Sequence, residues 1–308
     1  MRHVFIINPA AGKTDRTDEI REQINNLSTQ EKVEVFITEG VRDAERIARR
    51  EVSKGDEVRI YACGGDGTAN EVLTGVQGYK NCAMGIIPIG SGNDFVRSLE
   101  PFKREDFLKI ENMIKGTEKE IDLIECNGKY SMNIFSVGFD CSVANNVERF
   151  KKLPLVSGSL AYKMSIIYCL FAKRKHKVVI EVDGEVLEKT KSKTTLLTVG
   201  GNGQFYGGGI KAAPKALLDD GYIDFVHVST IAAIRFIFLL GKYIKGLHIN
   251  NPKFPFVTFK RCKEIKFISD ETIDINVDGE IFPEKNPVAR LSEKALRIVL
   301  PNVEKNYG

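Results

Sequence analysis

The chain has 308 residues and carries 45 Lys and Arg against 41 Asp and Glu, a net charge of +4. Its hydrophobic content of 43% is typical of a folded protein and argues against a largely disordered chain. The mild charge excess argues against a dedicated nucleic-acid binder, and no apolar run approaches the roughly 18 residues that a membrane-spanning helix needs.

Residues 1–90 predict a parallel sheet with helices on both faces. Short apolar runs, which are typical of buried strands, alternate with amphipathic stretches, which are typical of helices. Strands are predicted at 4–7, 33–38, 58–63 and 84–87, and helices at 14–26, 41–52 and 69–76.

Beyond about residue 118, strands dominate and follow one another closely. They are predicted at 121–125, 130–137, 178–182, 186–189, 194–199, 223–228, 256–260, 264–268, 272–277 and 295–300, with helices at 142–151, 159–174 and 231–245. We therefore predict an α/β nucleotide-binding domain over 1–125 and a β-rich sandwich domain over 126–295. Residues 296–308 could return to the first domain as a strand.

Three polar, glycine-rich segments follow predicted strands, at 8–13, 64–68 and 88–95. Each could by itself be an ordinary turn, but together they lie at the sheet edge where open parallel sheets bind ligands. Glycine lets the backbone approach an anion, and a helix N-terminus supplies free N–H groups. Asp66 could cap the helix, or it could serve a divalent cation beside a phosphate. Neither a Walker A loop nor a dinucleotide fingerprint follows the first strand.

These three segments together resemble the nucleotide site of the diacylglycerol-kinase-type lipid kinases, in particular the soluble bacterial branch. The resemblance continues in order through Asp122, 133–140, 200–202, Pro214 with 217–221, and 277–280. It implies a first domain related to those of phosphofructokinases and NAD kinases, a β-rich second domain, and ATP in the cleft between the two.

The resemblance also implies ATP and Mg²⁺ as cofactors and assigns residues to the nucleotide. The implied nucleotide-binding residues are Asn8, Pro9, Ala10, Ala11, Gly12, Lys13, Thr38, Gly64, Gly65, Asp66, Gly67, Thr68, Asn70, Ser91, Gly92 and Asn93.

Glu280 takes the place of the family's catalytic base, and Asp66 is assigned a catalytic role at the metal. Taken alone, Glu280 could be an ordinary solvated turn residue. Asp122 could belong to a polar network near the metal, or it could be a capping or buried, paired carboxylate. The resemblance implies a second, structural magnesium site made of Asp220 and the backbone carbonyls of Leu217 and Tyr222. Asp94, like Asp66, could be a metal ligand because Mg²⁺ is held by few carboxylates, directly or through water.

The expected reaction is therefore the phosphorylation of a lipid hydroxyl, with diacylglycerol as the expected acceptor. Two alternatives remain open: an NAD kinase, and a non-catalytic lipid- or nucleotide-binding protein. Residues 145–193 hold eleven basic and five acidic side chains, and 231–240 is strongly apolar, so either segment could meet an anionic membrane surface.

We further expect a cytoplasmic, peripherally membrane-associated protein, because the N-terminal apolar run is too short for a secretory signal. No nucleic-acid partner is expected. Sheet edges in the second domain could pair two copies across a two-fold axis. The six cysteines are spread along the chain without a CxxC pair, so we expect reduced thiols that fill the core.

Overall fold

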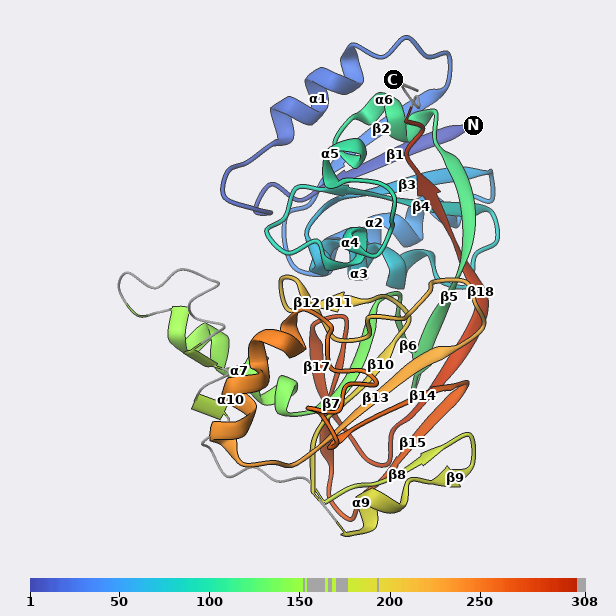
Figure 1. The fold of residues 1–308 in the computed structure, drawn as a ribbon. Coiled ribbons are helices and arrows are strands. Elements are labelled where there is room, and N and C mark those ends of the chain that lie inside the picture. The colour runs from blue at the N-terminus through green and yellow to red at the C-terminus, as the bar shows by residue number, and fades with distance from the viewer. Residues whose placement is uncertain (152, 154–163, 166–167, 170–176, 193, 304–308) are drawn as a thin grey trace, which may run out of the picture. The chain divides into compact units, whose positions relative to one another are not determined.

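The structure is a computed structural model of the chain, and it describes all residues except 152, 154–163, 166–167, 170–176, 193 and 304–308 (Figure 1). The chain divides into two compact units. Unit 1 comprises Met1–Asp122 with the segment that begins at Glu293, and unit 2 comprises Leu123–Ser292. The strands β5 (Thr117–Cys126) and β18 (Val288–Leu300) contain the points where the chain passes from one unit to the other.

Unit 1 contains a parallel sheet in the order β2-β1-β3-β4, and the last residues of β18 pair with β4. The strands are β1 (Arg2–Ile7), β2 (Lys32–Ile37), β3 (Val58–Gly64) and β4 (Cys82–Pro88). β1 and β4 are buried along their whole length, as expected for strands with helices on both faces. Because β1 lies between β2 and β3, the chain reverses its direction of strand addition here. Open sheets bind ligands at such a switch point.

Helices cover both faces of this sheet; Figure 1 shows α1 and α6 on one side and α2 and α3 on the other. The helices are α1 (Thr17–Asn25), α2 (Asp43–Val52), α3 (Asp66–Val76), α4 (Asp94–Arg97), α5 (Arg104–Phe107) and α6 (Ile110–Ile114). α2 and α3 pack closely because Gly75 has no side chain: a Cβ there would lie 2.6 Å from the carbonyl oxygen of Glu45.

Unit 2 is built on a six-stranded antiparallel sheet in the order β14-β13-β10-β7-β16-β17. Its strands are β7 (Ile134–Gly138), β10 (Thr195–Gly201), β13 (Ile223–Ser229), β14 (Val257–Cys262), β16 (Ile273–Val277) and β17 (Glu280–Glu284). A second layer of the same unit contains β8 (Val179–Val182), β9 (Glu185–Val186), β15 (Glu264–Ile268) and the first residues of β18. The short strands are β6 (Lys129–Ser131), β11 (Phe205–Tyr206) and β12 (Ile210–Lys211).

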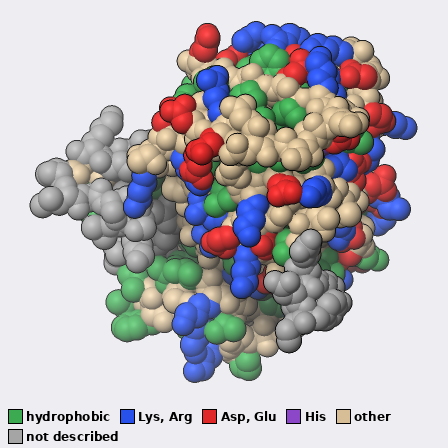
Figure 2. Space-filling model, turned by 90° about the horizontal axis from the view of Figure 1, so that it is seen from above, with side chains coloured by type: hydrophobic (Ala, Val, Ile, Leu, Met, Phe, Trp, Pro, Cys, Tyr) green, Lys and Arg blue, Asp and Glu red, His purple; other side chains and the backbone are tan. Residues whose placement is uncertain are grey.

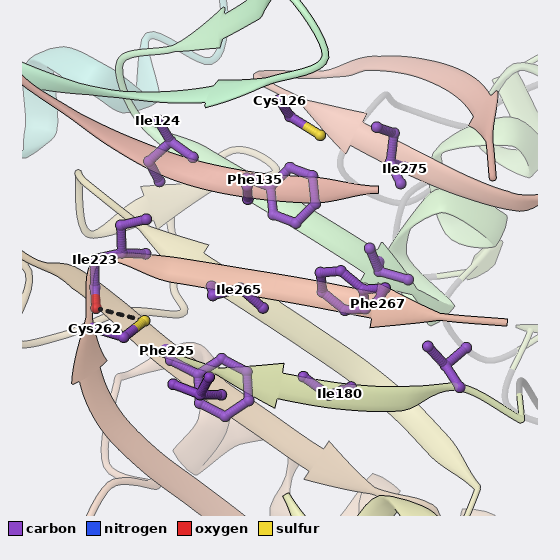
Figure 3. Packing of buried hydrophobic residues seen from close by; sticks show 14 of the residues in the cluster. Ile124, Cys126, Phe135, Ile180, Ile223, Phe225, Cys262, Ile265, Phe267 and Ile275 are labelled. Atoms are coloured by element: carbon purple, nitrogen blue, oxygen red, sulfur yellow. Dashed lines mark hydrogen bonds between the residues drawn. The ribbon is translucent and has the colours of Figure 1, made fainter. Parts of the chain in front are cut away.

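The core of unit 2 lies between these two layers (Figure 3). Phe135 and Phe225 from the six-stranded sheet meet Ile265 and Phe267 of β15, and the rings of Phe135 and Phe267 are 5.8 Å apart. The other face of the six-stranded sheet packs against a cluster that includes Tyr243 of α10. Among the described residues of unit 2, the helices are α7 (Phe139–Lys151), α9 (Glu188–Ser192) and α10 (Ala233–Ile244).

The predicted fold class is confirmed: an α/β unit is followed by a β-sandwich unit. Two predicted strands are wrong in detail. The segment 186–189 forms the end of β9 and the start of α9, and 130–137 divides into β6 and β7. Most of the helix predicted at 159–174 lies outside the described residues. Among those described, no helix is long and apolar enough to cross a bilayer.

Candidate active site

The loops that follow β1, β3 and β4 meet at one edge of the unit 1 sheet. β3 pairs in parallel with both β1 and β4, so the three carboxyl ends lie side by side. The Asn8 side-chain amide donates to Thr68 Oγ1 at 3.0 Å, and the Gly90 N–H donates to the Gly64 carbonyl at 3.0 Å. The structure thus brings together the three segments that the sequence singled out.

Several glycines in these loops lie where a Cβ would collide with a neighbouring backbone or side chain. A Cβ at Gly90 would lie 2.3 Å from Gly65 Cα, and one at Gly64 would lie 2.2 Å from Thr68 Oγ1. Gly12 has a φ of +86°, and a Cβ there would lie 2.5 Å from the Ile89 carbonyl oxygen. Gly67 differs, because no atom lies within 4 Å of where its Cβ would be.

Asp66 links the β3 loop to the β4 loop. It is the first residue of α3, and its two carboxylate oxygens accept the N–H groups of Asn93 and Asp94, each at 2.8 Å. A Cβ at Gly92 would lie 2.4 Å from Asp66 Oδ2, so this contact also depends on glycine. The carboxylate therefore holds the start of α4 against the start of α3.

Asn93 fixes the β4 loop from inside. It is buried in the left-handed conformation with a φ of 53°, and its amide donates to the carbonyls of Pro88 at 3.2 Å and Gly90 at 2.6 Å. Arg104 of α5 donates to the same two carbonyls, at 2.8 Å and 3.3 Å. The sequence reasoning missed Arg104, because nothing in its local pattern indicates which loop it contacts.

The remaining predicted nucleotide residues line the same edge with different exposure. Thr38, which follows β2, is buried, and its N–H donates to the Ile7 carbonyl at 2.9 Å. Asn70 is buried in α3, whereas Lys13 and Ser91 are exposed. Because the first N–H groups of a helix have no intrahelical acceptor, the exposed start of α3 offers donors to an anion.

Two acidic residues of unit 1 lie in different surroundings. Asp94 is buried, and its Oδ1 lies 3.5 Å from the Arg97 guanidinium. Asp122 is buried in β5 and accepts the N–H of Lys294 at 2.8 Å, which ties β5 to β18. Asp122 is therefore a buried carboxylate with a backbone partner on β18.

In unit 2, Glu280 begins β17 directly after a tight turn. Asp278 and Gly279 have φ values of 48° and 96°, as a two-residue hairpin requires. The Glu280 side chain is 49% exposed, and its Oε2 lies 3.6 Å from the Lys129 ammonium. The Glu280 carboxylate is thus accessible from solvent and lies beside the Lys129 ammonium.

The Asp278 carboxylate anchors this turn. It accepts hydrogen bonds from the Ser131 hydroxyl at 2.7 Å and from the N–H groups of Met132 and Ile134, each at 2.8 Å. The hairpin that carries Glu280 is thereby fixed to the connection between β6 and β7.

The predicted structural metal site contains an ion pair. Asp220 Oδ2 lies 3.3 Å from Arg261 Nη1, and Asp224 Oδ1 lies 3.3 Å from Arg261 Nε. Burial raises the pKa of Asp224 to about 6, although the nearby Arg261 acts in the opposite direction. Within the described residues, no three His, Cys, Asp or Glu side chains form a metal-binding cluster. Carboxylate and carbonyl oxygens still suit Mg²⁺, which needs few protein ligands, but here Arg261 competes for Asp220.

Two family models match the chain, one for each part of the fold. The model for the diacylglycerol kinase catalytic domain matches residues 2–126. The model for the YegS C-terminal NAD kinase beta sandwich-like domain matches residues 133–300.

Curated relatives match over most of the chain. A diacylglycerol kinase of Bacillus subtilis (strain 168) is 33% identical over 223 residues, which is 72% of this chain and 70% of that protein. A diacylglycerol kinase of Staphylococcus aureus (strain MRSA252) is 30% identical over 303 residues, 97% of this chain and 92% of that protein. The crystal structure of a diacylglycerol kinase from Bacillus anthracis str. Sterne shares the fold, with a TM-score of 0.72, 20% identity, and coverage of 97% of this chain and 96% of that one.

Proposed function

Because the chain belongs to the diacylglycerol kinase family of lipid kinases, we propose that it transfers the γ-phosphate of ATP to a membrane lipid hydroxyl. Diacylglycerol is the proposed acceptor and phosphatidic acid the product. The observation that carries the proposal is the junction of three glycine-rich loops at the switch point of a parallel sheet, held together by Asp66.

In unit 1, backbone groups bind the phosphates of ATP. The start of α3 supplies N–H donors and the positive end of a helix dipole. Gly67 leaves open space in which a phosphate can approach the backbone, and the exposed Lys13 of the loop after β1 supplies positive charge. Phosphoryl transfer depends mainly on such positioning and charge neutralisation.

In unit 2, Glu280 acts as the general base. Its carboxylate takes the proton of the acceptor hydroxyl while the oxygen forms a bond to the γ-phosphorus and ADP departs with the electrons of the broken bond. The anchored Asp278 turn holds Glu280 in place, and Lys129 keeps a positive charge beside it. A base of this kind typically contributes about 10²–10⁴ in rate.

Mg²⁺ accompanies ATP and neutralises charge on the transferred phosphoryl group. Asp66 and Asp94 are the first residues of α3 and α4, directly after the glycine-rich loops, and they would hold it directly or through water. Asp220, with the carbonyls of Leu217 and Tyr222, would hold a second, structural Mg²⁺. When this Mg²⁺ binds, either the Arg261 guanidinium moves away from Asp220 or the Asp220 carboxylate interacts with both cations.

The test is transfer of radiolabelled γ-phosphate by the purified protein with Mg²⁺ and mixed micelles. Separate reactions contain diacylglycerol, phosphatidylglycerol, a sphingoid base, or NAD in solution. Glu280→Gln removes the base, and Glu284→Gln, in the same strand, is the charge-matched control. We expect label in phosphatidic acid, a fall in kcat of about 10²–10⁴ for Glu280→Gln, and no more than about a twofold change for the control.

Three outcomes would contradict parts of the proposal. Label in another lipid would retain the chemistry and change the acceptor. Label in NAD alone would refute the lipid-kinase assignment. Full activity in Glu280→Gln would refute the assignment of the base.

A further inference from the structure

The helix α10 of unit 2 exposes a row of apolar side chains that no described element covers. Ile234 is 59% exposed and Phe238 is 80% exposed. They lie four residues apart and therefore on one face of the helix, and the exposed Gly241 and Lys245 continue the same row. The opposite face holds α10 to the unit through the buried Phe236 and Tyr243.

A third exposed apolar side chain, Leu247, follows the end of α10. Gly246 has a φ of 73°, and the N–H of Leu247 donates to the Lys242 carbonyl at 2.9 Å, which turns the chain back at the helix end. Leu247 is 53% exposed as a result. We refer to Ile234, Phe238 and Leu247 as the α10 apolar row.

α10 and the segment that follows it carry basic side chains and no acidic ones. No Asp or Glu occurs between Asp224 and Glu264. Arg235, Lys242 and Lys245 lie on α10 or at its end, and Lys253 follows, whereas Lys260 and Arg261 of β14 form ion pairs with carboxylates elsewhere in unit 2. Lys242 and Lys253 lie close enough for Lys253 to lower the pKa of the Lys242 ammonium. Figure 2 shows hydrophobic and basic side chains next to one another at the lower left of that view.

We propose that α10 is a docking surface for an anionic lipid bilayer, with the α10 apolar row entering the headgroup region and the basic side chains of α10, Arg235, Lys242 and Lys245, contacting lipid phosphates. An amphipathic helix with apolar residues on one side and Lys and Arg around them binds membranes in this way. The row is too small for a stable protein interface, which needs about 20–30 residues on each side. The role of this docking surface rests on the proposed function, since a lipid kinase must reach its acceptor at a membrane. Binding to the membrane can nevertheless be measured without catalysis.

The test is sedimentation of the full chain with vesicles that contain neither diacylglycerol nor nucleotide. One set contains phosphatidylglycerol and phosphatidylcholine, and the other contains phosphatidylcholine only. Phe238→Asp places a charge in the α10 apolar row, and Val41→Asp, at a site that is 91% exposed in unit 1, is its matched control. Arg235→Gln with Lys242→Gln removes two charges, and Lys32→Gln is the control for charge.

We expect binding to the anionic vesicles that weakens as salt is raised, and little binding to phosphatidylcholine. Phe238→Asp should weaken the binding by at least about tenfold, and each lost basic residue by about fivefold, while both controls bind as the unchanged protein does. Equal binding by Phe238→Asp and the unchanged protein would overturn the proposal. A dimer in analytical ultracentrifugation that Phe238→Asp dissociates would overturn it too, because the row would then be an interface between copies.

A second measurement separates this inference from the proposed function. Phosphate transfer to a short-chain diacylglycerol dissolved in water needs no membrane, so Phe238→Asp should leave that rate unchanged. A protein that binds vesicles as expected but never transfers phosphate would refute the proposed function and leave the docking surface standing. Loss of the water-soluble reaction in Phe238→Asp would show that α10 acts in catalysis and not in docking.

Discussion

Replacing Asp66 with Asn tests whether this carboxylate holds two loops together. Both of its oxygens accept backbone N–H groups at 2.8 Å, from Asn93 and Asp94. An amide has one acceptor oxygen, so Asp66→Asn keeps one bond and turns an NH₂ group toward the other N–H. Hydrogen bonds to charged groups contribute about 1.5–3 kcal/mol each, so we expect a loss of about 2–3 kcal/mol in the stability of unit 1.

Amide hydrogen exchange measures this loss at the bonds themselves. The N–H groups of Asn93 and Asp94 should exchange faster in Asp66→Asn, and urea unfolding of unit 1 should shift to lower concentration. Glu22→Gln, an exposed change of the same charge in α1, is the control and should alter stability by less than about 0.5 kcal/mol. Unchanged exchange at both amides, with nucleotide binding lost, would refute this reasoning and leave Asp66 with a purely chemical role.

Two further predictions concern stability. Gly90→Ala forces a Cβ to within 2.3 Å of Gly65 Cα, and because both are backbone positions we expect a loss of at least about 1–3 kcal/mol in urea unfolding; a variant as stable as the original would contradict the close approach. The pKa of Asp224 is raised to about 6 in the folded chain, so the folded state binds this proton more tightly than the unfolded chain does. The stability of unit 2 should therefore fall by about 3 kcal/mol as pH rises from about 4 to about 6. Asp224→Asn should remove that slope; the same slope in the variant would assign it to another group.

The three loops of unit 1 could be predicted from the sequence because each is marked by neighbouring residues alone. A strand that ends in glycine and polar residues identifies a turn, and parallel topology brings such turns to one edge. The hydrogen bonds from the backbone N–H groups of Asn93 and Asp94 to Asp66 could not be predicted. These residues lie 27 and 28 positions after Asp66 in the sequence, and the bonds depend on how the two loops fold against each other. The hydrogen bonds of Arg104 to the Pro88 and Gly90 carbonyls could not be predicted for the same reason.

In unit 2 the errors have local causes. No strand was predicted where β17 lies. Pro283 weakens the strand signal there, but β17 is the edge of its sheet, where a missing N–H is tolerated. The segment 186–189 was predicted as a strand, but β9 ends at Val186 and the polar residues from Glu188 form α9. The turn before Glu280 was predictable from Asp278-Gly279, whereas the bonds that anchor it to β6 and β7 were not.

The burial of the cysteines makes this chain convenient to label. All six are buried and free of disulfides, and burial raises the pKa of Cys82, Cys126 and Cys262 to about 12. Since the thiolate is the reactive form, these native thiols should react slowly with maleimide dyes. A single new cysteine at an exposed position such as Phe238 would therefore take a dye selectively, and its emission colour would report directly whether that position enters lipid.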